Sequence, residues 1–306
     1  MTAATARAPG KLNLALTVGP LQPSGFHPVA TIYHAVDLCD DVRATPTTGT
    51  EITVEVTYEG PPPAEHLPLG EDNLAVRAAT LLRDSAGVRA GVELHVRKAI
   101  PVAGGMAGGS ADAAAALVAC DAAWQLGTPR ERLTELAGEL GSDVPFSLHG
   151  GTALGTGRGE QLSPVLSSGT FLWVLAVAER GLSTPAVYAA YDGLAGAAAV
   201  RGPEPQVSPA LMSALRAGNA VALGAALSNE LQEAALWLRP ELADTLAVGA
   251  ECGALGSVVS GSGPTVAFLA ADDEQALDLA LALTGAGVCA DVVQAIGPAA
   301  GTRLVG

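Results

Sequence analysis

The chain carries at its first third the stretch 101-PVAGGMAGGSADAAAALVACDAAWQ-125, with four glycines among its first nine residues and none afterwards. Glycine lets main-chain N–H groups converge on an anion, and a helix that begins there adds the positive end of its dipole. The segment 104-GGMAGGS-110 followed by an alanine-rich helix is therefore typical of a polyphosphate-binding loop. Ser110 and Asp112 are the N-cap candidates for that helix.

The same glycines also suit a purely structural turn, so this segment alone leaves both interpretations open. The chain contains no G-x-x-x-x-G-K-[ST] motif and no G-x-G-x-x-G motif after a strand. Neither the Walker loop nor the dinucleotide-binding fingerprint therefore applies.

Composition narrows the classes of protein that the chain can represent. Its 306 residues are 49% hydrophobic, which is enough for a large core and suits two domains that share a cleft. A formal charge of −15 argues against a nucleic-acid-binding surface, which needs clustered Lys and Arg. The four cysteines show no metal-ligand spacing and are predicted to be core residues. The first residues lack a signal-peptide core, and no apolar run could span a bilayer, so we expect a cytoplasmic protein.

Periodicity predicts alternating strands and helices in the first half of the chain and a second strand–helix region after a polar crossing. Asp72 or Asn73 can cap the first helix, and Gly87 ends it. The expected strands cover 12–18, 51–59, 91–100 and 171–178, with a strand–turn–strand unit over 258–270. The expected helices cover 74–87, the stretch after the glycine loop, 130–141, 184–195, 208–216, 218–227 and 239–251, and the crossing covers 157–169.

Two further segments change how the glycine loop is interpreted. The N-terminal segment 8-APGKLNLALTVG-19 and the C-terminal segment 260-SGSGPTV-266, taken with the loop, resemble the three signature motifs of the GHMP kinase superfamily. The resemblance implies an α+β fold with an N-terminal domain like ribosomal protein S5 and a C-terminal α/β domain. We place these domains at 1–160 and 161–306, with an interdomain cleft and with ATP lying along the loop.

Within the superfamily, several segments are similar to those of the 4-diphosphocytidyl-2-C-methyl-D-erythritol kinase family. This resemblance implies ATP-dependent phosphorylation of the 2-hydroxyl of that small molecule in the non-mevalonate isoprenoid pathway, with Mg²⁺ expected alongside ATP. The sequence does not identify any carboxylate as a metal ligand. The segments are 10-GKLNLAL-16, 24-SGFHPVATIYHAVDLCDDV-42, 72-DNLAVRAATLL-82, 101-PVAGGMAGGSADAA-114 and 141-GSDVPFSLHGGTALGTGRGE-160.

The ATP-binding residues that the resemblance implies lie in the loop and just before the helix at 74. Helix capping is an equal role for Asn73. The loop departs from the family pattern, since Ala103 and Ala107 replace glycines and Ala111 replaces a second serine; the two alanines at 103 and 107 are tolerable only if their φ angles are negative. The implied residues are Pro101, Val102, Ala103, Gly104, Gly105, Met106, Ala107, Gly108, Gly109, Ser110, Ala111 and Asn73.

The resemblance assigns the chemistry to Asp143, with Lys11 beside it. Phosphoryl transfer needs a group that orients or deprotonates the attacking hydroxyl, and positive charge to stabilise the transferring group. An ammonium near the carboxylate would keep it ionised and could stabilise the phosphoryl group. By residue type alone, Asp143 is more typical of an ordinary turn or helix cap, and Lys11 of a solvated lysine before a strand.

Substrate recognition is assigned by resemblance mainly to 24-SGFHPVATIYH-34. His27 would read the edge of the cytosine ring, and Tyr33 or Phe26 would stack on its face. Asn13 would hold the substrate near Lys11. The turn 260–264 would lie near the substrate and the loop, and Thr184 and Pro185 would border the methylerythritol end.

Two other functions fit parts of this pattern. A homoserine or mevalonate kinase would share the glycine loop but would not need a pyrimidine-reading segment. A non-catalytic ligand-binding protein of the same fold would be expected to lose Lys11 or Asp143, and this chain keeps both. A small-molecule substrate is expected, with no nucleic-acid or membrane partner.

Overall fold

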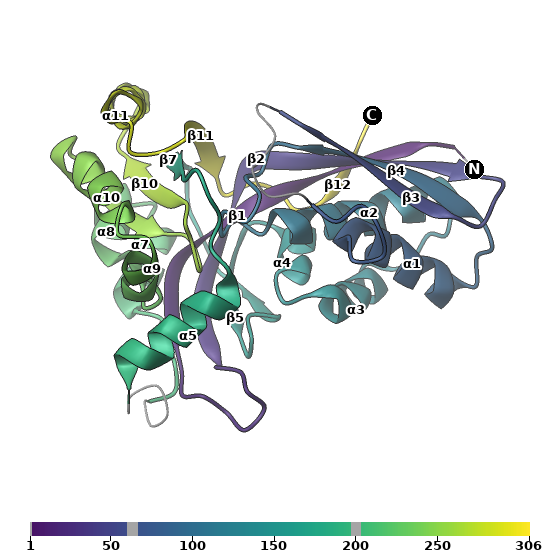
Figure 1. The fold of residues 1–306 in the computed structure, drawn as a ribbon, viewed down its shortest axis with the longest axis horizontal. Coiled ribbons are helices and arrows are strands. Elements are labelled where there is room, and N and C mark those ends of the chain that lie inside the picture. Colours follow the sequence, from purple (N-terminus) through teal and green to yellow (C-terminus); the bar gives the residue numbers. More distant parts are fainter. Residues whose placement is uncertain (1, 60–66, 197–202) are drawn as a thin grey trace.

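The computed structural model describes residues 2–59, 67–196 and 203–306, and it contains a large and a small β-sheet (Figure 1). The large sheet has eight strands in the order β12-β1-β2-β4-β3, with β5 paired to β2 and β6, and β8 paired to β1. Its strands are β1 (Ala4–Val18), β2 (Val29–Thr47), β3 (Ile52–Tyr58), β4 (Gly91–Lys98), β5 (Thr152–Thr156), β6 (Gln161–Pro164), β8 (Ser228–Asn229) and β12 (Arg303–Val305).

The long antiparallel pair β1–β2 positions the N-terminal motif. Its register pairs Lys11 with Ala35 and Asn13 with Tyr33. Lys11 therefore lies inside a strand that begins at Ala4, and the prediction that it precedes a strand was wrong. The register between β1 and β2 shifts at two places, after Pro9 and after Asn13. The strand is almost fully buried here, so Lys11 points into the protein rather than into bulk water.

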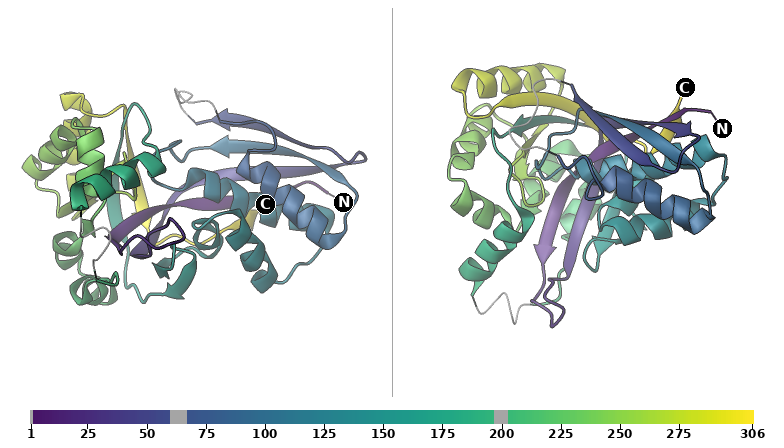
Figure 2. Two further views of the ribbon diagram at one scale, coloured as in Figure 1. Left: turned by 60° about the horizontal axis from the view of Figure 1, so that its bottom comes forward. Right: turned by 45° about the vertical axis from the view of Figure 1, so that its right-hand side comes forward.

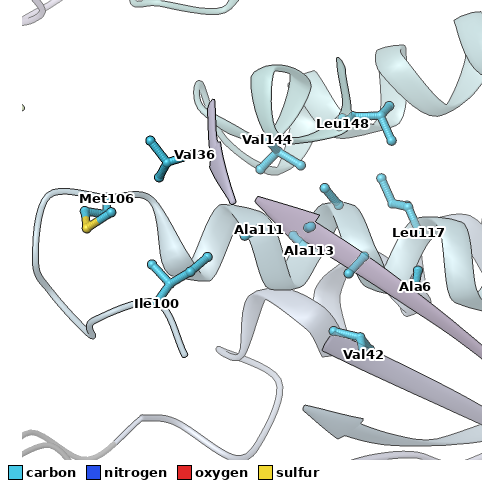
Figure 3. Packing of buried hydrophobic residues seen from close by; sticks show 14 of the residues in the cluster. Ala6, Val36, Val42, Ile100, Met106, Ala111, Ala113, Leu117, Val144 and Leu148 are labelled. Atoms are coloured by element: carbon cyan, nitrogen blue, oxygen red, sulfur yellow. The ribbon is translucent and has the colours of Figure 1, made fainter. Parts of the chain in front are cut away.

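Three helices pack against one face of the large sheet, namely α1 (Leu74–Ala86), α2 (Gly108–Trp124) and α4 (Val144–His149), and α3 (Arg130–Leu140) packs against these helices (Figure 1). Helix α2 is central and is lined on all sides by buried alanines, which allow close approach to β1 and β2. Figure 3 shows Ala111, Ala113 and Leu117 of this helix packed among side chains from the strands and from α4. The alanine-rich composition is thus explained by a helix buried on every side.

The second half of the chain forms a four-stranded antiparallel sheet in the order β11-β7-β10-β9, with helices beside it (Figures 1 and 2). Its strands are β7 (Phe171–Val177), β9 (Gly256–Val259), β10 (Val266–Ala270) and β11 (Asp291–Gly297). The helices are α5 (Thr184–Ala195), α7 (Pro209–Ala217), α8 (Ala220–Ala226), α9 (Gln232–Leu238), α10 (Leu242–Glu251) and α11 (Asp273–Ala286). The expected helices, the strand at 171 and the strand–turn–strand unit at 258–270 are therefore confirmed, whereas α4, α9 and α11 were not predicted.

The predicted crossing at 157–169 contains β6, which still belongs to the large sheet, and the chain reaches the small sheet only at β7. Strands β8 and β12 also return to the large sheet. The two sheets therefore share chain from both halves, and the division at residue 160 stays a prediction.

Two expectations from composition can be compared with this fold. All four cysteines are free; Cys120 is buried, as predicted for a core residue, and the other three are half-buried. Within residues 2–59, 67–196 and 203–306, no helix combines the length and apolarity needed to cross a bilayer.

Candidate active site

A cavity of about 780 Å³ lies between the large sheet, the glycine loop and α5, and its volume is in the range of small-molecule sites. Its lining brings together segments from both halves of the chain: the middle of β1, the loop between β1 and β2, the glycine loop, the turn before α4, one side of α5 and the turn between β9 and β10. Predicted site residues that line it are Lys11, Asn13, Phe26, His27, Tyr33, Pro101, Val102, Ala103, Gly104, Gly105, Ala107, Gly108, Gly109, Ser110, Asp143, Thr184 and Pro185.

The three sequence motifs converge on the carbonyl oxygen of Gly105. This oxygen accepts a hydrogen bond of 2.6 Å from Lys11 Nζ and one of 3.2 Å from Ser260 Oγ. A main-chain bond of 3.2 Å also joins Thr265 N to Gly104 O. The prediction that the 260–264 turn lies near the glycine loop is confirmed. Gly105 itself has a φ of +78°, and a Cβ there would collide with the carbonyl of Ser260.

The glycine loop enters α2 differently from the prediction. Helix α2 begins at Gly108, its N-cap is Ala107, and no side chain caps it, so Ser110 and Asp112 are not N-caps. The φ angles of Ala103 and Ala107 are +52° and +58°, which contradicts the expectation of negative values. A left-handed alanine costs roughly 1–2 kcal/mol. The backbone at positions 103 and 107 therefore adopts the left-handed conformation that glycine favours, although both residues are alanine.

Asp112 does not cap the helix but forms part of a buried ion cluster beneath the loop. Lys98 Nζ lies 2.6 Å from Asp40 Oδ2 and 2.7 Å from Asp112 Oδ2. Asp40 Oδ1 also accepts the main-chain N–H groups of residues 99 and 100. Burial raises the pKa of Asp112 to about 8, and Lys98 opposes that change. A Cβ on Gly108 would lie 3.3 Å from Lys98 Nζ, so the cluster directly underlies the helix start.

Three of the predicted ATP-binding residues do not line the cavity. Met106 and Ala111 are fully buried and belong to the hydrophobic core. Figure 3 shows Met106 on the loop before α2, with Ile100 and Val36 nearby, and Ala111 on the helix. Asn73 caps α1: its Oδ1 accepts from Ala75 N at 2.9 Å, and its Nδ2 donates to Pro68 O at 2.8 Å. Capping is therefore confirmed for Oδ1 of Asn73, and its assignment to the ATP site stays a prediction.

Lys11 is buried yet directed toward the cavity. Its ammonium donates to Asn13 Oδ1 at 2.6 Å, and Asn13 Nδ2 donates to Thr31 Oγ1 at 2.7 Å. Burial lowers the pKa of Lys11 below its usual 10.5, and the charge of Asp143 acts in the opposite direction. Lys11 and Asp143 thus influence each other across the cavity, although the ammonium contacts Asn13 and Gly105 rather than the carboxylate.

Asp143 occupies the N-cap position of α4, but its side chain makes no capping hydrogen bond. Instead Oδ1 accepts a 2.9 Å hydrogen bond from the hydroxyl of Tyr33. The ring of Tyr33 stacks on Phe146 at 4.9 Å and is only 3% exposed. Of the two alternatives for stacking on a base, Tyr33 or Phe26, the geometry therefore favours Phe26. Tyr33 reaches the site through its hydroxyl.

Phe26 and His27 lie in the loop between β1 and β2, beside α5 (Figures 1 and 2). The ring of Phe26 is 54% exposed, and the guanidinium of Arg158 lies 5.3 Å from its centroid. The His27 ring is buried; Nδ1 lies 2.7 Å from Gly19 O, and Nε2 lies 3.0 Å from Asp192 Oδ1. Both ring nitrogens therefore face protein groups, which differs from the expected free edge for a base.

Sequence reasoning missed the α5 residues that surround His27. Tyr188 stacks on the His27 ring at 5.7 Å, and Tyr191 meets it edge-on at 5.9 Å. Tyr188 and Asp192 also line the cavity. Their spacing of i, i+3 and i+4 on one helix face was a usable signal, but only once α5 was known to meet the loop. Thr184, which was predicted, joins α5 to the 260–264 turn through a 2.9 Å contact with Ser262 Oγ.

Comparison with known proteins agrees with this geometry. The family models described as "GHMP kinases N terminal domain" and "GHMP kinases C terminal" match residues 73–151 and 211–289. A 4-diphosphocytidyl-2-C-methyl-D-erythritol kinase from Thermobifida fusca is 55% identical, with 99% of each chain covered. The protein of the same name from Streptomyces coelicolor is 52% identical, covering 98% of this chain and 99% of its own.

Solved structures give the same result at the level of the fold. A crystal structure of 4-(cytidine 5'-diphospho)-2C-methyl-D-erythritol kinase superposes with a TM-score of 0.77 at 30% identity, covering 96% of this chain and 99% of the other. Mevalonate kinase of L. major, at 16% identity and a TM-score of 0.75 with 96% of each chain covered, shares the fold alone. The chain belongs to the GHMP kinases and, within them, to the family of 4-diphosphocytidyl-2-C-methyl-D-erythritol kinases.

Proposed function

We propose that this protein uses ATP to phosphorylate the 2-hydroxyl of 4-diphosphocytidyl-2-C-methyl-D-erythritol, a step of the non-mevalonate isoprenoid pathway. The observation that carries the proposal is that Lys11 and Asp143 line the same cavity as the glycine loop and the aromatic loop at 26–27. A phosphoryl donor, a phosphoryl acceptor and the two charged groups can therefore meet in one place. Relatives that are 50–55% identical over nearly the whole chain bear the corresponding enzyme name.

ATP would lie along the loop from Pro101 to Ser110, with its phosphates at the start of α2. The main-chain N–H groups at Gly108 and Gly109 have no preceding helical turn to bond, and the helix dipole favours negative charge there. This local attraction must work against the overall charge of −15. Met106 and Ala111 would support the loop from the core side rather than contact the nucleotide.

Mg²⁺ is expected with ATP and fits this site without a dedicated carboxylate cage. Magnesium commonly keeps several waters and takes most of its other ligands from substrate phosphates. Within the described residues no cluster of three acidic, histidine or cysteine side chains could hold a metal. The Ser110 hydroxyl at the cavity is the loop group that would reach the ion or a phosphate. The chemistry of the ion would be to neutralise charge on the transferring phosphoryl group.

Asp143 would orient the substrate hydroxyl and accept its proton. Tyr33 holds Oδ1 at 2.9 Å, which fixes the carboxylate and leaves Oδ2 to face the acceptor. Burial and the neighbouring carboxylate raise the pKa of Tyr33 well above 10, so its hydroxyl stays a donor at neutral pH. A carboxylate fixed in this way acts as a general base only toward a hydroxyl that lies within hydrogen-bond distance of Oδ2.

Lys11 would stabilise negative charge on the attacking oxygen and the transferring phosphoryl group. Two acceptors, Gly105 O and Asn13 Oδ1, each 2.6 Å away, hold the ammonium in position. Its third N–H remains for a ligand, since an ammonium has three donors. Asn13 would therefore act on the substrate through Lys11, and the contact with Gly105 links the catalytic lysine to the nucleotide loop.

The cytidine end of the substrate would lie against Phe26 and Tyr188. Phe26 offers an exposed ring, and both side chains line the cavity near His27. Stacking of a base on an aromatic side chain contributes roughly 1–3 kcal/mol. Thr184 and Pro185, at the beginning of α5, would border the methylerythritol portion. We also propose that the two functional units correspond approximately to residues 1–160 and 161–306.

A kinase assay on the purified chain with Mg²⁺-ATP tests the proposal. We expect phosphorylation of the cytidylylated methylerythritol, and no detectable use of methylerythritol phosphate, homoserine or mevalonate. Asp143→Asn should bind both ligands and turn over about 10²–10⁴-fold more slowly. Asp278→Asn, an exposed carboxylate on α11, is the matched control and should be unchanged. Preferred use of homoserine or mevalonate would overturn the substrate assignment.

A further inference from the structure

The side chain of Asn229 connects the two sheets close to Lys11 and is not part of the proposed chemistry. Asn229 lies on β8, which pairs in parallel with β1, the strand that carries Lys11, at Leu16. The next residue fixes the same segment, because Glu230 N donates to Leu16 O at 2.9 Å and Glu230 Oε2 accepts from Val18 N at 2.6 Å. The backbone at Asn229 is therefore anchored on the strand of the catalytic lysine.

The amide of Asn229 reaches from this strand to the turn between β9 and β10. Its Nδ2 donates two hydrogen bonds of 2.7 Å, one to Val259 O and one to Gly261 O, which lie on either side of Ser260. Its Oδ1 accepts a hydrogen bond of 2.9 Å from Leu231 N. A carbonyl oxygen can only accept, so the amide has a single orientation, and both of its N–H groups are used.

Gly261, which this amide holds, lies directly against the ammonium of Lys11. A Cβ on Gly261 would lie 3.0 Å from Lys11 Nζ and Asn13 Oδ1, and 3.4 Å from Gly105 O. These three atoms are the ammonium and its two acceptors. A displacement of the main chain at Gly261 would therefore change the space that the ammonium occupies.

Ser260 provides a second connection between the turn and the lysine. Its Oγ donates to Gly105 O at 3.2 Å, and the same oxygen accepts from Lys11 Nζ at 2.6 Å. Because Asn229 bonds the carbonyl before Ser260 and the carbonyl after it, the amide restrains the backbone that carries this hydroxyl. One side chain from β8 thus supports both contacts that the turn makes around the ammonium.

We propose that Asn229 is a positioning residue for the phosphoryl transfer: by holding the carbonyl groups of Val259 and Gly261, it keeps the turn against Lys11 and the ammonium directed at the transferring group. The inference rests on the proposed function, because the role of Lys11 comes from there. Asn229 does not line the cavity, and it acts through the turn rather than on a ligand.

Two substitutions remove the donor in different ways. Asn229→Asp keeps the shape and the acceptor for Leu231 N, but a carboxylate has no hydrogen to donate and repels the two carbonyl oxygens. Asn229→Ala removes the amide altogether. A catalytic group that is misplaced by about 1 Å can cost about 10²-fold in rate, so we expect kcat to fall between about tenfold and 100-fold in both variants. The KM for the cytidylylated substrate should be nearly unchanged.

Gln232→Ala is the matched control, because Gln232 also holds the end of β9. Its Oε1 accepts a hydrogen bond of 2.9 Å from Val259 N, on the strand side of Ser260, and it does not bond Gly261. This variant should melt at a lower temperature than the wild type, as Asn229→Ala should, but keep the wild-type kcat. If kcat simply followed the melting temperature across the three variants, Asn229 would be only structural, and the proposal would be overturned.

A measurement without turnover separates this inference from the proposed function. The sequence contains two lysines, Lys11 and Lys98. In protein labelled with ¹³C at the lysine Cε, NMR therefore shows two lysine signals, and Lys11→Gln assigns them. Lys98, held between two carboxylates, is the internal reference. We expect both Asn229 variants to shift the Lys11 signal and not that of Lys98, and Gln232→Ala to shift neither.

The two measurements fail independently. If the Lys11 signal shifts as expected but the wild-type protein does not phosphorylate the cytidylylated substrate, the proposed reaction fails, while Asn229 still positions Lys11. If the kinase is active but the Lys11 signal is the same in the wild type and in both Asn229 variants, the role of Asn229 fails. Wild-type kcat in Asn229→Asp and Asn229→Ala would overturn the proposal as well.

Discussion

The hydroxyl of Tyr33 donates a 2.9 Å hydrogen bond to Oδ1 of Asp143, while the ring of Tyr33 is stacked on Phe146. This contact connects the second strand of the large sheet to the beginning of α4. It also holds one oxygen of a carboxylate whose residue lines the cavity. The positions of Gly155 and Gly159 are part of the same arrangement, because a Cβ at either residue would collide with Tyr33.

Tyr33→Phe should therefore lower kcat more than it lowers stability. The ring contacts remain, but Asp143 loses a hydrogen bond to a charged group, which contributes about 1.5–3 kcal/mol. We expect kcat to fall roughly tenfold or more, with the KM for ATP nearly unchanged. Steady-state kinetics and a thermal melt measure both quantities. A variant with wild-type kcat would show that Asp143 does not depend on Tyr33.

Gly261→Ala should impair catalysis through Lys11. Gly261 has a φ of +58°, and a Cβ there would lie 3.0 Å from both Lys11 Nζ and Asn13 Oδ1. Displacing a catalytic group by about 1 Å can cost about 10²-fold in rate. We expect kcat to fall by about that factor. The control is Gly285→Ala, in the exposed part of α11 with free space around it, which should keep full activity.

The convergence of the motifs could be predicted from the sequence, because each motif has its own pattern of glycines and charged residues. Lys11, the glycine loop, Asp143 and the 260–264 turn do line one cavity or contact one another. The entry into α2 could not be predicted from capping preferences. Those preferences assume a polar side chain at the N-cap, whereas here the loop leaves the first N–H groups free and Ala107 occupies that position.

The contacts of α5 were also beyond the sequence. Nothing in the pattern of residues 184–195 indicates that Tyr188 and Asp192 would meet His27, because that contact depends on how the small sheet is placed against the large one. The burial of Met106 and Ala111 was missed for a similar reason. A loop read as a linear motif does not reveal which of its side chains point into the core.

Ala107→Gly should stabilise the protein slightly. Ala107 has a φ of +58°, which costs an alanine roughly 1–2 kcal/mol, while glycine adds entropy to the unfolded chain that offsets part of the gain. We expect the free energy of unfolding to rise by about 0.5–1 kcal/mol in a urea titration. Ala122→Gly, in the helical part of α2, should instead lower it by about 1 kcal/mol. Equal losses in both variants would contradict the left-handed conformation of Ala107.

The free energy of unfolding of Asp112→Asn should increase relative to that of the wild type as pH rises. Burial raises the pKa of Asp112 to about 8, above its usual 3.8, so between these values the folded state binds a proton that the unfolded state has lost. Wild-type stability from this group is thus fully present below about pH 4 and is lost as pH rises toward 8, by at most about 1.4 kcal/mol per pH unit. An amide does not titrate, so the variant should escape this loss. Urea titrations of both proteins at pH 5.5 and pH 8 measure the difference.

Asp40→Asn is the comparison, because Asp40 also accepts hydrogen bonds from two main-chain N–H groups and its replacement should lower stability at both pH values. A difference between Asp112→Asn and the wild type that does not change with pH would mean that Asp112 is ionised in the folded protein throughout this range.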